Sequence, residues 1–288
     1  MTLKHILRSN KITRYLITQT RILQYTTIPN LISNSSFNIG RMLRVNRIYT
    51  NSKYEKLKIL KNKHKDERCF IVATGPSLKI EDLEKLKKEV TFSMNSICLA
   101  FDETEWRPTY YGIQGIHVFN QLKKYIEKID VQCKFIGDTI PIQKMNSEDY
   151  VYPLNLLNHA RQHKKYKTKF SNDAFAVVYD GYSITYSLIQ IAVFMGFNEI
   201  YLLGVDCNYS SDMNHHFKEY GHVDPTFAIA GEKMISAYKE AKKYADKNNI
   251  KIYNATRGGM LEIFERVDLD IVLSKDKKNN ILLHESIS

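Results

Sequence analysis

Cysteines, long apolar runs and acidic N-terminal residues are all scarce in this chain, and each scarcity excludes something. The 288 residues include four cysteines with no CxxC pair, namely Cys69, Cys98, Cys133 and Cys207. This pattern offers no structural zinc site and is typical of reduced core cysteines in a cytoplasmic protein. No apolar run approaches the ~18 residues that a membrane-spanning helix needs, so we expect no transmembrane segment.

Acidic residues are nearly absent from the first part of the chain. Before Asp66, Glu55 is the only one, against fourteen lysines and arginines. This stretch therefore carries a net charge of +13. Because the net charge of the whole chain is +11, the remainder carries −2. The basic character belongs to residues 1–65 and not to the body of the protein.

Apolar side chains such as Leu16 and Tyr25 are interleaved with the charges of this basic segment. A cationic stretch with an apolar component is typical of a segment that binds an anionic membrane surface. An organellar transit peptide and a solvated extension share this composition, so all three interpretations stay open. No nucleic-acid-binding motif follows, and we expect no nucleic-acid partner.

From Asp66 onward, strand and helix patterns alternate. Strands are expected at 69–73, 90–94, 109–113, 133–136, 199–205 and 250–253, with helices at 80–90, 183–195 and around 230–241. Such alternation predicts an α/β fold with a Rossmann-like, doubly wound, mainly parallel sheet. Residues 146–180 lack a clear pattern and are expected to form a lid or small subdomain. The predicted organisation is a basic extension at 1–65 and one domain at 66–288.

Polar or small residues follow five of the expected strands. Ligands bind beyond the carboxyl ends of the strands in open parallel sheets, so these residues are candidates for one common site. They are Thr74, Gly75, Pro76 and Ser77 after the first strand, Asn95 and Gln114 after the next two, and Asp206, Thr256 and Arg257 later in the chain.

The Gly-Pro-Ser turn at 75–77 is the most informative of these exits. A turn before a helix leaves backbone N–H groups free for an anion, and Gly75 lets the backbone approach a ligand. Ser77 is expected to cap the helix or to bond a phosphate oxygen, although a plain strand-to-helix connection has the same sequence. Asn95 and Gln114 suit a base or sugar, and Arg257 suits a phosphate or carboxylate.

Two adjacent histidines, His215 and His216, lie in a polar loop after Asp206. Histidine is the side chain best suited to move a proton near neutral pH, here from a sugar hydroxyl or to a phosphate leaving group. Asp206, Asp212 and the histidines are the alternative, a divalent-metal site, but their spacing fits no standard motif. Exposed histidines without a role are the third interpretation.

Several strings resemble known families. Residues 71–78, Ile-Val-Ala-Thr-Gly-Pro-Ser-Leu, with Asn95 further on, resemble the opening of the bacterial lipooligosaccharide sialyltransferases. Residues 196–206, 180–186 and 253–264 are similar to the larger family grouped with archaeal 6-hydroxymethylpterin diphosphokinases, whose bacterial members commonly lie among cell-surface glycan genes. The resemblance covers about residues 66–270 and implies a nucleotide-sugar-binding catalytic domain.

The resemblance also implies roles for single residues. Gly75, Pro76 and Ser77 would approach the phosphate and ribose of a nucleotide that Asn95 and Gln114 border. His216 falls where the sialyltransferases place their general base, with His215 as a substitute. Two departures concern the donor: Asp180-Gly181 stand where those enzymes have an arginine, and their Thr-Ser-Gly turn reads Ser183-Ile184-Thr185 here. Thr74, Asp206 and Thr256 complete the expected nucleotide site.

The first functional hypothesis is a glycosyltransferase of lipooligosaccharide or capsule synthesis. Its donor would be a nucleotide-activated sugar, with a CMP-linked acidic sugar favoured, and its acceptor a glycan or glycolipid. The phosphate would leave toward the turn at 75–77, with Arg257 or Tyr209 assisting, so no metal or other cofactor would be needed. The basic segment would hold the enzyme peripherally at the inner face of the cell membrane.

Two other hypotheses remain open. A diphosphokinase would move pyrophosphate from ATP to a small alcohol such as a pterin, and would need Mg²⁺ near Asp206 and Asp212. A catalytically silent nucleotide-binding scaffold would use the same fold without turnover. The sequence leaves open whether the chain forms a homo-oligomer.

Overall fold

The computed structural model describes residues 10–141, 143, 146–157, 159, 166–209, 215–221 and 227–274. The chain divides into two compact units, one of Met1–Ser52 with Leu156–Lys165, the other of Lys53–Asn155 with Tyr166–Ser288. The second unit therefore begins before the boundary at 65/66 that composition indicated. The short helix η2 (Glu55–Leu60) explains the difference, because its Leu57 and Leu60 are buried in the core.

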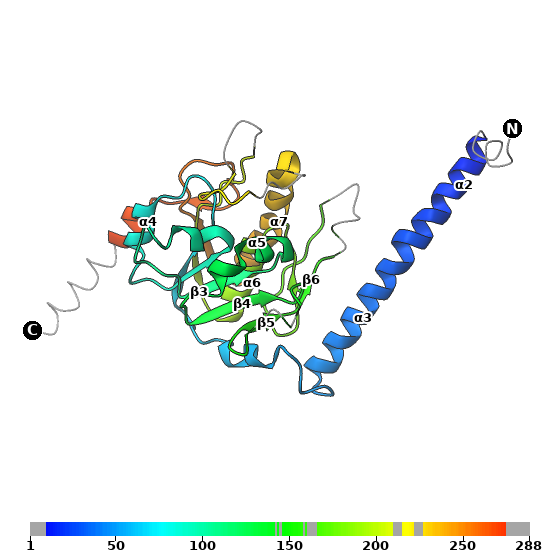
Figure 1. Ribbon diagram of the computed structural model, residues 1–288, viewed down its shortest axis with the longest axis horizontal. Helices are drawn as coiled ribbons and strands as arrows, with labels where there is room; N and C mark the ends of the chain where they lie inside the picture. The colour runs from blue at the N-terminus through cyan, green and yellow to red at the C-terminus, as the bar shows by residue number, and fades with distance from the viewer. Residues whose placement is uncertain are drawn as a thin grey trace, which may run out of the picture. The chain divides into compact units, whose positions relative to one another are not determined.

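The described part of the first unit is dominated by one long helix (Figure 1). It consists of α2 (Lys11–Ile22), a π turn η1 (Leu23–Thr27) and α3 (Ile28–Val45). The helix begins at Asn10, whose side chain accepts the Ile12 N–H at 2.9 Å. Within the described residues, no helix combines the length and apolarity needed to cross a bilayer.

The second unit is built on an eight-stranded parallel sheet in the order β10-β9-β8-β1-β2-β3-β4-β5. Its strands are β1 (Arg68–Val72), β2 (Thr91–Met94), β3 (Tyr110–Ile113), β4 (Cys133–Gly137), β5 (Tyr150–Tyr152), β8 (Glu199–Leu203), β9 (Lys251–Asn254) and β10 (Glu265–Arg266). The expected α/β class is confirmed. The chain adds strands on one side of β1 from β2 to β5 and on the other side from β8 onward. This reversal creates a crevice at the carboxyl ends of β1 and β8, where such sheets bind ligands.

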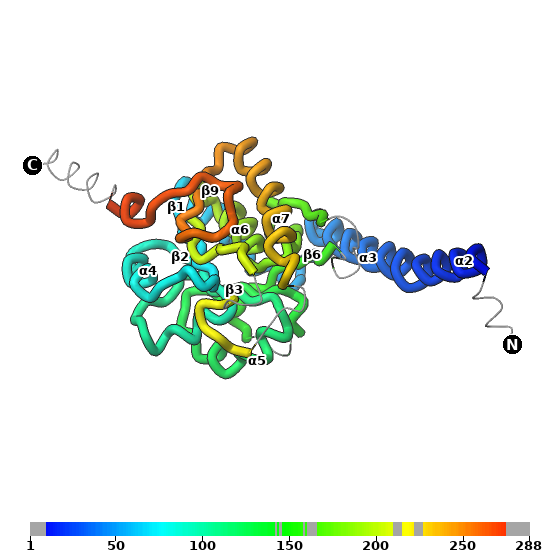
Figure 2. Tube along the Cα trace, turned by 90° about the horizontal axis from the view of Figure 1, so that it is seen from above, coloured from blue at the N-terminus to red at the C-terminus, as the bar shows by residue number. Residues whose placement is uncertain are grey.

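Helices cover both faces of this sheet (Figure 2). On one face α6 (Ile184–Phe194) and α7 (Phe227–Lys247) belong to the same hydrophobic core as Cys69 and Ile71, and on the other α4 (Ile80–Lys85), η3 (Asn95–Ala100) and α5 (Ile116–Ile126) belong to the same core as Phe70 and Val72. The alternation follows from the two-residue period of a strand, which sends neighbouring side chains to opposite faces. All four cysteines are buried and unpaired, as expected.

The structure differs from the sequence prediction in three elements. Helix α4 ends at Lys85, not near residue 90, and α5 was not predicted. The segment 146–180, expected to be irregular, contributes β5 and a small two-stranded parallel sheet of β6 (Leu154–Asn155) and β7 (Val178–Tyr179). Strands of two or three residues are too short to show an apolar alternation in the sequence.

Candidate active site

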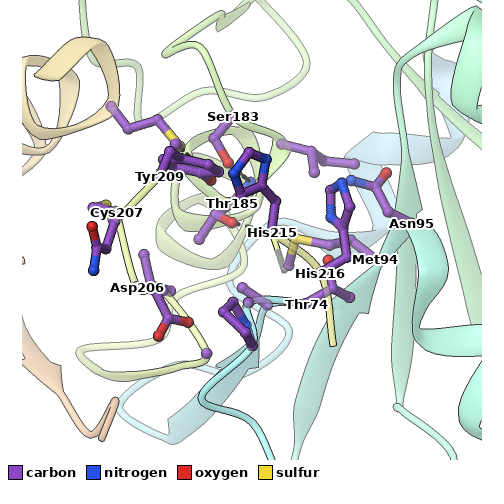
Figure 3. A pocket seen from close by; sticks show the side chains of 18 of the residues that line it. Thr74, Met94, Asn95, Ser183, Thr185, Asp206, Cys207, Tyr209, His215 and His216 are labelled. Carbon is purple, nitrogen blue, oxygen red and sulfur yellow. Dashed lines mark hydrogen bonds between the residues drawn. The ribbon is translucent and has the colours of Figure 1, made fainter. Parts of the chain in front are cut away.

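A pocket lies beyond the carboxyl ends of β1, β2 and β8, at the reversal point of the sheet (Figure 3). Its lining includes Thr74, Gly75, Pro76, Asn95, Ser183, Thr185, Asp206, Tyr209, His215 and His216. A larger pocket adjoins it, shares both histidines, and adds Gln114, Asp180 and Tyr220. The cavity volumes are about 110 Å³ and 360 Å³. The second is within the range of small-molecule sites, about 300–1,000 Å³.

The loops after β1 and β8 approach each other very closely at Gly75. Its N–H donates to the carbonyl oxygen of Gly204 at 3.0 Å. A Cβ atom at position 75 would lie 2.0 Å from Asp206 Oδ2 and 2.4 Å from the Gly204 oxygen, so only glycine fits there. The Gly75 N–H is therefore occupied, which corrects the expectation that it is free to bind a phosphate.

The Asp206 carboxylate lies against the turn at 75–77, where the sequence predicted that the phosphate of a ligand would bind. Its carboxylate accepts hydrogen bonds from the Ser77 hydroxyl, at 2.9 Å, and from the Ser77 backbone N–H. Burial raises the pKa of the Asp206 carboxyl above its usual range, and these hydrogen bonds only partly oppose that rise. Ser77 does not cap a helix either, because α4 starts at Ile80 with Lys79 as the N-cap. The turn at 75–77 thus binds a carboxylate of its own chain.

The two histidines are held over the exit of β1 by a backbone hydrogen bond. The Phe217 N–H donates to the Thr74 carbonyl oxygen at 2.8 Å, which ties the histidine loop to the Gly-Pro-Ser turn. The His215 ring lies edge-on to Tyr209, with centroids 5.3 Å apart, and His216 lies 4.9 Å from the Tyr220 ring. In Figure 3 both imidazoles lie in the middle of the group, and Asn95 is beside His216.

The backbone around the pocket has positive φ angles at three non-glycine residues, two of which are strained. Asn95, Tyr182 and Cys207 have φ angles of 48°, 65° and 51°, in the left-handed region. Asparagine adopts this region readily, but tyrosine and cysteine do so only at a cost of about 1–3 kcal/mol each. Such strain is common at ligand sites, because the surrounding structure must hold the loop in one conformation.

Tyr238 contributes a polar group that sequence reasoning missed. Its side chain is 1% exposed and lines the smaller pocket from α7. Its hydroxyl lies near Ser183 and Thr185, yet it makes no hydrogen bond of good geometry within the described residues. Burial raises the pKa of this tyrosine, so the hydroxyl stays protonated and can donate. In the sequence Tyr238 reads only as one more residue on the apolar face of a helix.

Gln114 borders the larger pocket, but its side chain is committed to the protein. Its Oε1 accepts hydrogen bonds from the Tyr152 hydroxyl at 2.9 Å and from the Ser187 hydroxyl at 2.8 Å. Its Nε2 lies 3.5 Å from Asp180 Oδ1. Gln114 therefore fixes the wall between β3 and α6.

Thr256 and Arg257 lie in a different pocket, together with Asp82, Arg266 and Asp268. The Thr256 hydroxyl accepts the Val205 N–H at 3.0 Å and so supports the loop after β8. Arg257 forms a bidentate ion pair with the buried carboxylate of Asp82. Because Thr256 bonds to Val205 and Arg257 pairs with Asp82, both residues lie outside the two pockets that the histidines line. This corrects the expectation that they join the nucleotide site.

Positive charge and metal ligands are both scarce around the two pockets. Among the residues that the structure describes, no lysine or arginine lines either pocket. In the same part of the chain, no three His, Cys, Asp or Glu side chains gather to hold a metal ion. Asp212, the second carboxylate of the metal interpretation, lies outside the described residues.

Comparison with known proteins identifies the family. The family model described as 6-hydroxymethylpterin diphosphokinase MptE-like matches residues 44–212, and the chain belongs to this MptE-like family. The resemblance inferred from the sequence is confirmed at this level. A search of curated proteins finds no match.

Two solved structures are similar in fold. The MAf glycosyltransferase from Magnetospirillum magneticum AMB-1 is 16% identical, with a TM-score of 0.46, over 72% of this chain and 34% of that one. The chain thus spans about a third of that protein. The sialyltransferase CstII from Campylobacter jejuni, in complex with the substrate analogue CMP-3FNeuAc, is 13% identical, with a TM-score of 0.38, over 69% of this chain and 84% of that one. These similarities concern the fold alone.

Proposed function

We propose that this protein is a glycosyltransferase of cell-surface glycan synthesis that uses a nucleotide-activated sugar, with a CMP-linked acidic sugar as the favoured donor. One observation carries the proposal. The two histidines and the loop after β1 line a single pocket, and the hydrogen bond from Phe217 to Thr74 fixes them there. A proton acceptor thus lies in a pocket that adjoins a larger one of about 360 Å³, and the two together provide the room for a nucleotide-activated sugar.

His216 is the proposed general base, with His215 as the substitute. The oxygen of an acceptor hydroxyl attacks the anomeric carbon of the donor and gives its proton to the imidazole. The bond from the anomeric carbon to the phosphate oxygen breaks, and its electron pair leaves with the phosphate. The larger pocket, which both histidines also line, provides room for the acceptor glycan.

The departing phosphate needs polar groups, and the proposed ones belong to α6 and α7. Ser183 and Thr185 bring the N-terminal turn of the eleven-residue helix α6 into the pocket, where the helix dipole favours an anion, although the Ser183 hydroxyl already caps the Thr185 N–H at 3.2 Å. The buried Tyr238 hydroxyl supports this location, because it can donate a hydrogen bond and lacks a well-oriented acceptor. The anion site is thus proposed at α6, opposite the turn that Asp206 already occupies.

Among the described residues, no lysine or arginine lines either pocket, which favours a donor that leaves with one phosphate. Two or more phosphates would require arginine, lysine or a metal ion to balance their charge, whereas a nucleoside monophosphate requires the least. Residues 1–65 are proposed to hold the enzyme at the inner, anionic face of the cell membrane, where lipid-linked acceptors lie.

Family membership favours one alternative, an ATP-dependent diphosphokinase. This reaction needs Mg²⁺, which prefers carboxylate and phosphate oxygens. The described residues fit that ion poorly, because Asp206 is the carboxylate in the smaller pocket and Ser77 already engages it.

The test combines nucleotide binding with one substitution. We expect CMP to raise the melting temperature, and His216→Ala to lower turnover by ~10²–10⁴-fold while CMP binding persists. His117→Ala is the control, since His117 is an exposed histidine on α5 outside both pocket linings. Equal turnover in the His216→Ala variant and the parent would refute the base. Stabilisation by ATP only with Mg²⁺, and loss of activity in EDTA, would instead indicate the diphosphokinase.

A further inference from the structure

One side of the N-terminal helix is apolar and open to solvent along its described length. The residues of this apolar stripe recur three, four or seven positions apart on each side of the π turn, and each is between 45% and 70% exposed. They are Ile12, Tyr15, Leu16, Ile22, Leu23, Ile28, Leu31, Ile32, Ile39 and Met42.

The π turn makes this stripe continuous. The Ile28 N–H bonds to the carbonyl oxygen of Leu23, five residues back instead of four. Pro29, at the start of α3, has no N–H to bond in the regular α pattern, which favours the wider turn. In an unbroken α-helix Ile28 would point about 140° away from Leu23, but the inserted residue returns it to the same side.

Charge identifies what this stripe faces. The first 54 positions of the chain contain no acidic residue. By helical spacing, Arg14 and Arg21 lie on the side of α2 opposite Ile12 and Leu16. An apolar stripe on a helix whose charged residues are all basic is the pattern of a helix lying in the surface of an anionic membrane.

We infer that the helix Lys11–Val45 lies along an anionic lipid surface with its apolar stripe against the acyl chains, and that the π turn sets the register of the stripe. The inference deepens the membrane partner of the proposed function and is independent of the reaction. A second copy is a poorer occupant, because both helices would carry only basic charges and no acidic residue could form an ion pair between them. A nucleic acid would contact the arginines and leave the stripe in water.

Two deletions in the full-length chain test the register and keep every stripe residue and every charge. Removing Gln24, Thr26 and Thr27 leaves Leu23 and Ile28 two positions apart, about 200° around a helix, and splits the stripe. Removing Thr26 alone leaves them four positions apart, on one side of a regular α-helix. We expect the parent and the Thr26 deletion to sediment equally with phosphatidylcholine–phosphatidylglycerol vesicles, and the triple deletion to bind at least about tenfold more weakly.

Charge substitutions provide the second arm. Arg14→Gln and Arg21→Gln should each weaken binding to the anionic vesicles by about fivefold and leave the weak binding to phosphatidylcholine alone unchanged. Circular dichroism should show equal helicity in all variants. Equal vesicle binding by the triple deletion and the parent would overturn the inference. So would dimers in sedimentation analysis that the triple deletion disrupts, with no vesicle binding by the parent.

Turnover on a soluble acceptor without lipid separates this inference from the proposed reaction. Both deletions should leave that turnover at the parent level. Loss of vesicle binding therefore tests the helix alone, and loss of turnover in His216→Ala tests the reaction alone.

Discussion

Replacing Gly75 with alanine should separate the two loops that form the floor of the pocket. The new methyl group would lie 2.0 Å from Asp206 Oδ2 and 2.4 Å from the Gly204 backbone oxygen, whereas ordinary contacts begin near 3.4 Å. Because one of these atoms is backbone, the loops must move apart by about an ångström. Overpacking of this kind costs about 1–3 kcal/mol, which for a unit of this size lowers the melting temperature by about 2–12 °C.

The same movement should affect catalysis, since the histidine loop is hydrogen-bonded through Phe217 to Thr74, the neighbour of Gly75. A displacement of one ångström at a reacting group can cost ~10²-fold in rate. Thermal unfolding and turnover of the purified variant measure the two effects. Gly40→Ala, in α3 of the other unit, is the control, because nothing lies within 4 Å of a Cβ there; it should leave turnover and the melting temperature of the second unit unchanged. A Gly75→Ala variant that keeps the stability and turnover of the Gly40→Ala control would refute the close packing of the two loops.

Two further predictions concern charges near the strand exits. Burial raises the pKa of Asp206, so its ionisation disfavours the folded state as pH rises above the unfolded value of about 3.9. Asp206→Asn should therefore raise the melting temperature relative to the parent at pH 7. Melting temperatures measured over a pH series should show this gain vanishing below about pH 4. An equal gain at pH 7 and below pH 4 would contradict the desolvation argument. Arg257→Ala should leave the buried Asp82 carboxylate unpaired and cost about 1–3 kcal/mol, with calorimetry showing unchanged nucleotide affinity. Weaker nucleotide binding by a folded Arg257→Ala variant would indicate that Arg257 belongs to the nucleotide site.

The sheet was predictable because its central strands are buried on both faces. The segment from Glu199 to Val205 is a nearly continuous apolar run, and such runs are typical of inner parallel strands. The carboxyl ends of parallel strands lie at one edge, so the meeting of Thr74, Asn95 and Asp206 follows from the order of the elements. Strands such as β6 and β10 have only two residues each and leave no such signal.

The partners of the site residues were not predictable, because they come from distant parts of the chain. Ser77 looks like a helix cap locally, but it bonds to Asp206, 129 positions away. Arg257 looks like a phosphate ligand beside a glycine turn, but Asp82 lies 175 positions away and engages it. Local sequence specifies which groups can form hydrogen bonds, and only the folded topology decides which partner each receives.

The position of Asp206 changes the role of the Gly-Pro-Ser turn. A phosphate at the turn would have to displace a carboxylate that already accepts hydrogen bonds from the Ser77 hydroxyl and N–H, and it would stand beside a like charge whenever Asp206 is ionised. The turn is therefore better suited to hold two loops together than to bind the leaving group. On this argument, disruption of the turn should reduce the rate of transfer more than the affinity for nucleotide. The opposite holds for Ser183 and Thr185 at the start of α6, where loss of a hydroxyl should weaken nucleotide binding first.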